Sequence, residues 1–78
     1  MSMAQTITFP LDREFIALND LLKLAGVCDS GGAGKALVAA GEVSVDGAPE
    51  SRKTAKIRAG QVVGVGGTGG VRIKVVAA

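Results

Sequence analysis

The chain has 78 residues and a net charge of +2, with 47% hydrophobic and 21% charged residues. This length allows one small domain, and the composition is that of a folded protein. One cysteine, Cys28, and no histidine exclude an internal disulfide, a zinc site of Cys and His ligands, and a Ser-His-Asp or Cys-His catalytic pair. No apolar run suits a membrane-spanning helix, and the first residues lack the features of a signal peptide. We therefore expect a single cytoplasmic domain.

Residues 1–12 are expected to form an N-terminal segment ahead of the main domain, which spans residues 13–78. Within this segment, residues 6–9 alternate polar and apolar side chains, which is typical of a short strand, and Pro10 is expected to end it. Asp12 then follows as a candidate N-cap for a first helix.

The first helix is predicted over residues 13–25. Apolar residues recur there at helical spacing, and they define one buried face that consists of Phe15, Leu18, Leu22 and Ala25. Leu11 and Ile16 would form a hydrophobic staple around its start, and Gly26 is the natural C-terminal stop.

A second helix is predicted over residues 32–40, capped by Asp29 or Ser30. Lys35 is expected on its exposed side, and the residues expected to face inward are Ala36, Leu37 and Ala40. Only a few residues join the two helices, so they should pack as neighbours.

After Gly41 the apolar period changes from helical to alternating. Asp46-Gly47 predicts a hairpin between a strand at residues 43–45 and a return segment at residues 48–52, because a type I′ turn needs positive φ at both central residues. Ile57 with residues 62–65 predicts a further strand, residues 66–70 a loop, and residues 71–75 a last strand. The predicted fold is α+β, with two N-terminal helices packed on a small antiparallel sheet of three to four strands.

Charge is divided unevenly along the chain. Residues 1–50 carry a net charge of −4, whereas residues 51–78 carry +6 and contain no acidic residue. An uncompensated basic half favours a polyanionic partner, although lysine and arginine also keep the edges of sheets soluble.

Short motifs follow one another in a fixed order over residues 14–65. They are Glu14–Leu18 with Leu21-Leu22-Lys23 and Gly26, then Ser30-Gly31-Gly32 with Lys35, then Gly41–Gly47, and last Glu50, Arg52, Lys53, Lys56, Gly60-Gln61 and Val63. Together they resemble the RNA-binding domain named after ribosomal protein S-four, also called the αL motif, and in particular its small stand-alone bacterial members. Gly34 departs from the family, which usually has alanine there, and should weaken the second helix by about 0.5–1 kcal/mol.

The resemblance implies an αL fold that binds structured RNA, ribosomal or a related bacterial RNA, through a basic patch and without catalysis. We expect Lys35, Arg52 and Lys53 to share one surface and contact phosphates, with Lys56 and Arg58 at its edge. RNA is the expected partner of a monomer that needs no membrane, no metal and no cofactor.

Two glycines at the start of the second helix have two possible roles, and one glutamate after the hairpin is expected to position a cation. Gly31 and Gly32 either present backbone N–H groups to a phosphate or only shape the turn between the helices. Glu50 is expected to orient Arg52 or a nearby lysine rather than to touch RNA.

The alternative function is a protein–protein interaction module acting on a ribosome-associated factor, which would expose an apolar patch and bind independently of salt. The only aromatic residues are Phe9 and Phe15, and Phe15 is placed on the buried helix face, so a base-stacking platform is not expected. Arg72 and Lys74 lie outside the matching motifs and are not assigned to the patch.

Overall fold

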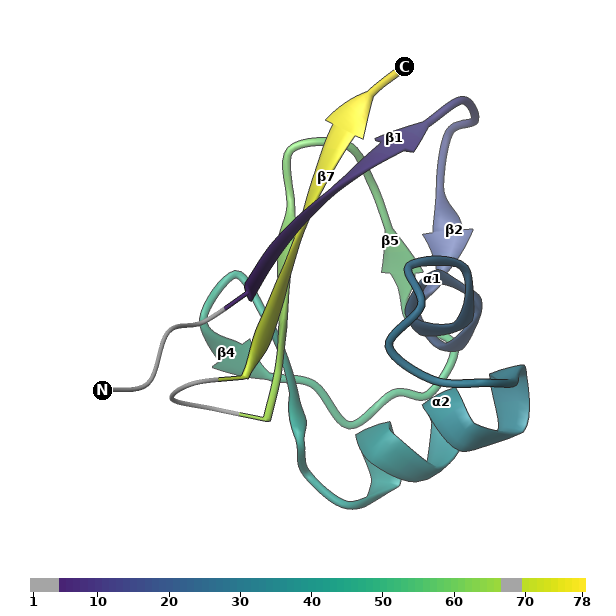
Figure 1. Cartoon of the computed structure of the whole chain (residues 1–78), viewed down its shortest axis with the longest axis vertical. Helices are drawn as coiled ribbons and strands as arrows, with labels where there is room; N and C mark the ends of the chain where they lie inside the picture. Colours follow the sequence, from purple (N-terminus) through teal and green to yellow (C-terminus); the bar gives the residue numbers. More distant parts are fainter. Residues whose placement is uncertain (1–4, 67–69) are drawn as a thin grey trace.

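The computed structural model describes residues 5–66 and 70–78. Two helices, a five-stranded sheet and a two-stranded sheet make up this part of the chain (Figure 1). The elements in chain order are β1 (Gln5–Leu11), β2 (Ile16–Ala17), α1 (Leu18–Leu24), α2 (Gly31–Ala39), β3 (Val43–Val45), β4 (Ala48–Pro49), β5 (Lys56–Ile57), β6 (Val62–Val65) and β7 (Val71–Ala77). The α+β class is confirmed, but the sheets differ from the prediction.

The larger sheet has the strand order β1-β7-β6-β3-β4. Its pairs are antiparallel except for β1 and β7, which run parallel from the Gln5–Val71 pair to the Leu11–Ala77 pair. The prediction of a purely antiparallel sheet of three to four strands was therefore wrong. Pro10 does not end β1, because β1 is an edge strand and tolerates a residue without an N–H donor.

The first helix is shorter than predicted. Ile16 pairs with Ile57 and Ala17 with Lys56 in the two-stranded sheet of β2 and β5, so α1 begins only at Leu18. Asp12 is not the N-cap, since Ala17 takes that position without a side-chain hydrogen bond. Ile57 belongs to this small sheet rather than to the strand at residues 62–65.

The second helix agrees with the prediction within one residue at each end. The Ser30 side chain accepts a hydrogen bond from the Ala33 N–H at 3.1 Å, so Ser30 and not Asp29 is the cap. Lys35 is exposed as expected, but the buried residues of α2 are Gly34 and Val38, whereas Ala36 and Ala40 are exposed.

The predicted hairpin between β3 and β4 is present. Asp46 and Gly47 have φ values of 51° and 84°, the two positive angles that a type I′ turn requires. The return strand is shorter than predicted and ends at Pro49. The loop predicted at residues 66–70 lies partly outside the described residues.

The core lies between one face of the larger sheet, α1 and the β2–β5 pair. Leucines of α1 pack there against valines and isoleucines of the strands. The buried hydrophobic residues are Leu11, Ile16, Leu18, Leu21, Leu22, Val38, Val43, Ala55, Ile57, Val63, Val65, Ile73 and Val75. None of the helices in the described ranges is long and apolar enough to cross a membrane.

Candidate nucleic-acid interface

Residues 53–58, which we call the basic segment, run alongside the start of α1. The N–H of Leu18 donates to the carbonyl of Ala55 at 2.8 Å, and the N–H of Asn19 donates to the carbonyl of Lys53 at 3.1 Å. The β2–β5 pairing continues this antiparallel arrangement. The chain from residue 53 to residue 58 is thus fixed along residues 15–19, and its exposed cations are spaced along that edge.

Helix α2 packs closely against Asn19 at the start of α1. Gly34 is buried, and a Cβ atom at this position would lie 2.7 Å from the backbone oxygen of Asn19. Asn19 itself is only 7% exposed. It therefore lies between α2 and the basic segment. Figure 1 shows α1, α2, β2 and β5 gathered on one side of the molecule, with β4 on the opposite side.

Arg52 is held by Glu50. The guanidinium donates from Nη2 to Oε1 at 3.0 Å and from Nε to Oε2 at 3.1 Å, and the Arg52 backbone N–H donates to Oε2 at 2.9 Å. These hydrogen bonds, the side-chain ones first, lower the pKa of Glu50 from 4.5 to about 2. The predicted orienting role of Glu50 toward Arg52 matches this geometry, and the arginine remains largely exposed.

Lys56 and Arg58 lie close to an aromatic ring. The Lys56 Nζ atom lies 4.8 Å from the centroid of the Phe15 ring, and the Arg58 Cζ atom lies 5.7 Å from it. Arg58 also donates to Glu14 at 3.2 Å. Both distances are in the range of cation–π attraction, which holds the two cations beside the ring.

Phe15 was expected on the buried face of the first helix, and this prediction was wrong. The residue precedes β2 and is 37% exposed. Phe15, Ile16 and Ala17 are all apolar, so no polar–apolar alternation indicated a strand there, and the helical spacing of Phe15 and Leu18 favoured a helix.

The first turn of α2 contains Gly31 and Gly32. The N–H groups of Ala33 and Gly34 bond to Ser30, so those of Gly31 and Gly32 are the ones open to a ligand. However, a Cβ atom at Gly31 would lie 3.7 Å from the Asp20 carboxylate and 3.3 Å from the Asn19 amide. An anion at Gly31 would therefore meet a neighbouring negative charge.

Arg72 and Lys74 are separated from the basic segment. They alternate along β7 with Ile73 and Val75, which are buried in the core that also contains the leucines of α1. Arg72 and Lys74 consequently point out of the opposite face of the larger sheet. The part of the chain that the structure describes has no cluster of acidic and cysteine side chains that could hold a metal ion.

The family model of the S4 domain matches residues 9–76, and the chain belongs to this family. The match extends over Arg72 and Lys74, beyond the motifs recognised in the sequence.

Relatives in two bacterial species share most of the chain. YbcJ of Escherichia coli, named as a candidate RNA-binding protein, is 49% identical over 61 residues, which cover 77% of this chain and 87% of YbcJ. RlbA of Bacillus subtilis, named as a candidate ribosome maturation protein, is 38% identical over 63 residues, 81% of this chain and 89% of RlbA.

A solved structure supports the fold assignment. The solution structure of Escherichia coli YbcJ, described as revealing an αL motif involved in RNA-binding, is similar with a TM-score of 0.62 and 43% identity. The likeness covers 99% of this chain and 92% of that one.

Proposed function

We propose that this protein binds structured RNA, ribosomal RNA or a related bacterial RNA, as a non-catalytic cytoplasmic monomer. The basic surface that we assign to this role consists of Lys35, Arg52, Lys53, Lys56 and Arg58. The observation that carries the proposal is the antiparallel pairing of residues 53–57 with residues 16–19, because it arranges several cations along one edge.

Each cation has a separate task in this proposal. Arg52, oriented by Glu50, offers its remaining guanidinium N–H groups to a phosphate in a fixed direction. Lys35 and Lys53, which have no carboxylate partner within the described ranges, neutralise phosphates as mobile point charges. The N–H groups of Gly31 and Gly32 add a weaker phosphate contact, since Asp20 lies nearby.

The relatives support the choice of RNA over other polyanions. YbcJ is described as carrying an αL motif involved in RNA-binding, and the name of RlbA refers to ribosome maturation. Because this chain covers most of both relatives, we extend RNA binding to it and favour ribosomal RNA as the target.

A protein–protein interaction module is less well supported. Among the described residues, the large hydrophobic side chains that are exposed are Phe15 and Leu24. The Phe15 ring has the cations of Lys56 and Arg58 beside it, so Phe15 does not form an open apolar patch with Leu24.

The proposal is tested by measuring the affinity of the protein for ribosomal RNA fragments, for transfer RNA and for duplex DNA of matched length, at one fixed salt concentration. We expect the structured RNAs to bind more tightly than the DNA, with the ribosomal fragments tightest. Equal affinity for RNA and DNA would mean non-specific attraction to phosphates and would contradict the proposal.

A further inference from the structure

The β2–β5 pair has an outer face with an aromatic ring and two cations beside it. Ile16 and Ile57 point into the core, so their neighbours in sequence point away from it. Phe15 and Ala17 flank Ile16 at β2, and Lys56 and Arg58 flank Ile57 at β5. The result is an exposed ring with positive charge within 6 Å, outside the hydrophobic core.

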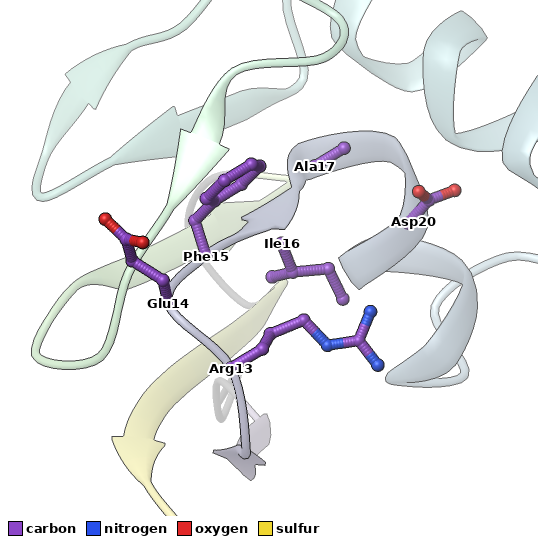
Figure 2. Close-up of a pocket in the computed structure, with 6 residues that line it drawn as sticks. All are labelled: Arg13, Glu14, Phe15, Ile16, Ala17 and Asp20. Atoms are coloured by element: carbon purple, nitrogen blue, oxygen red, sulfur yellow. The ribbon is translucent and has the colours of Figure 1, made fainter.

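A shallow pocket opens beside this ring. Its volume is about 340 Å³, which is sufficient for a small planar group, and its lining residues are Arg13, Glu14, Phe15, Ile16, Ala17 and Asp20. Figure 2 shows the Phe15 ring and the Arg13 guanidinium projecting from the segment before α1 and the Asp20 carboxylate projecting from α1, with Ile16 and Ala17 between them.

The charges around the pocket select what it can hold. Glu14 and Asp20 contribute two carboxylates to the lining, whereas Arg13 contributes one guanidinium, which is already paired with Asp12 at 3.4 Å. The lining is therefore unfavourable for a phosphate. A nucleobase is uncharged, offers N–H donors to carboxylates, and presents a flat face to the ring. Lys56 lies in β5 and Arg58 directly follows it, where both cations can reach the phosphates that flank such a base.

We propose that Phe15 is a stacking site for one unpaired base of the bound RNA, with Lys56 and Arg58 contacting the adjoining phosphates. This inference rests on the RNA binding proposed above and specifies the kind of RNA. A continuous duplex keeps its bases stacked inside the helix, whereas a bulge or loop can place one base against an aromatic side chain. The preferred ligand is therefore a helix interrupted by at least one unpaired nucleotide.

The chain has no tryptophan or tyrosine, so a single introduced tryptophan reports on its own surroundings. The variant Phe15→Trp is titrated with an RNA hairpin that carries one bulged adenosine, with the same hairpin lacking the bulge, and with inorganic polyphosphate. Stacking of the base should quench the tryptophan emission with the bulged hairpin only. The variant Leu24→Trp is the control, because Leu24 is 58% exposed and lies outside the pocket.

A second variant, Phe15→Leu, keeps an apolar side chain at this position but removes the aromatic face. We expect it to weaken binding of the bulged hairpin by about fivefold or more, from the measured range of base–aromatic stacking, and to leave the unbulged hairpin unchanged. Equal quenching by polyphosphate, or bulged-hairpin binding that Phe15→Leu does not alter, would overturn the stacking site while leaving the proposed function intact. Failure of the unsubstituted protein to bind either hairpin would overturn both.

Discussion

Arg52 forms a bidentate ion pair with Glu50 at the edge of the basic surface, and both carboxylate oxygens accept hydrogen bonds from the arginine. The two residues are separated by only one position, and the backbone N–H of Arg52 takes part. The guanidinium is consequently held in one orientation although it is exposed to solvent. Such an arrangement limits the entropy that Arg52 would lose when it binds a phosphate.

The first prediction concerns pH and stability. The pKa of Glu50 falls from 4.5 to about 2 in the folded protein, so folding favours the ionised carboxylate. Its contribution to stability is complete above pH 4.5, declines as the pH falls from 4.5 to 2, and is absent below pH 2. Urea denaturation should show Glu50→Gln less stable than the unsubstituted protein at pH 7, with the difference disappearing toward pH 2. The difference should be small because Arg52 is exposed.

The same substitution separates orientation from net charge in RNA binding. Removing an acidic group would strengthen RNA binding if only the total charge mattered. If Glu50 orients Arg52, Glu50→Gln should instead weaken binding by about two- to fivefold, which is the range expected from an exposed ion pair. Glu42→Gln is the matched control, since Glu42 is exposed and makes no ion pair in the described ranges. Stronger binding by both variants would contradict the orienting role.

Two glycines of α2 should respond to alanine in opposite directions. Gly32 is exposed, and its nearest neighbour would lie 3.8 Å from an added Cβ atom, so Gly32→Ala should stabilise the protein by about 0.5–1 kcal/mol. At Gly34 the added atom would lie 2.7 Å from the Asn19 backbone oxygen, and overpacking of about 1–3 kcal/mol should exceed the helical gain. Thermal melting of the two variants distinguishes them. A stabilised Gly34→Ala variant would mean that α1 and α2 can separate without cost.

The contact with Asn19 thus gives a structural reason for a glycine at position 34. The close approach to Asn19 brings α2 against the start of α1. The sequence alone suggested only a weakened helix, because the contact partner lies on another element.

Gly47 should tolerate no β-branched residue. Its φ of 84° lies in the left-handed region, and Gly47→Val should destabilise the domain by more than about 1 kcal/mol. Chemical denaturation measures this value. Gly32→Ala is the control for Gly47→Val, because Gly32 lies in α2 and has a helical backbone conformation. A neutral result for Gly47→Val would show that the Asp46-Gly47 turn adopts another conformation in solution.

Local patterns predicted local structure well. The Asp46-Gly47 turn and β7 depend on neighbouring residues and were recognisable in the sequence, and Ser30 was one of the two caps that it offered for α2. Errors occurred where a distant partner decides the structure. Ile16 pairs with Ile57, and β1 runs parallel to β7, and neither partner can be read from a local pattern.

In the candidate site, too, the features set by local sequence were predictable and those set by distant partners were not. The concentration of cations after residue 50 was evident from the sequence, and the resemblance to the αL motif led to Lys35, Arg52, Lys53, Lys56 and Arg58 as candidates. The exposure of Phe15 was not evident, because it depends on β5 pairing with β2 rather than on the residues around Phe15.

The most direct test of the basic surface is the salt dependence of RNA binding by the double variant Lys35→Ala/Arg52→Ala. With three to five phosphate contacts, the unsubstituted protein should show a log–log slope of about −2 to −4.5, and each lost contact should reduce its magnitude by about one. Lys74→Ala, which removes a cation from the outer face of β7, is the control and should leave slope and affinity unchanged. Arg52→Lys should recover only part of the affinity lost in Arg52→Ala, because lysine cannot donate two parallel hydrogen bonds to a phosphate. The account predicts a slope reduced by about two for the double variant, and an unchanged slope and affinity would contradict it.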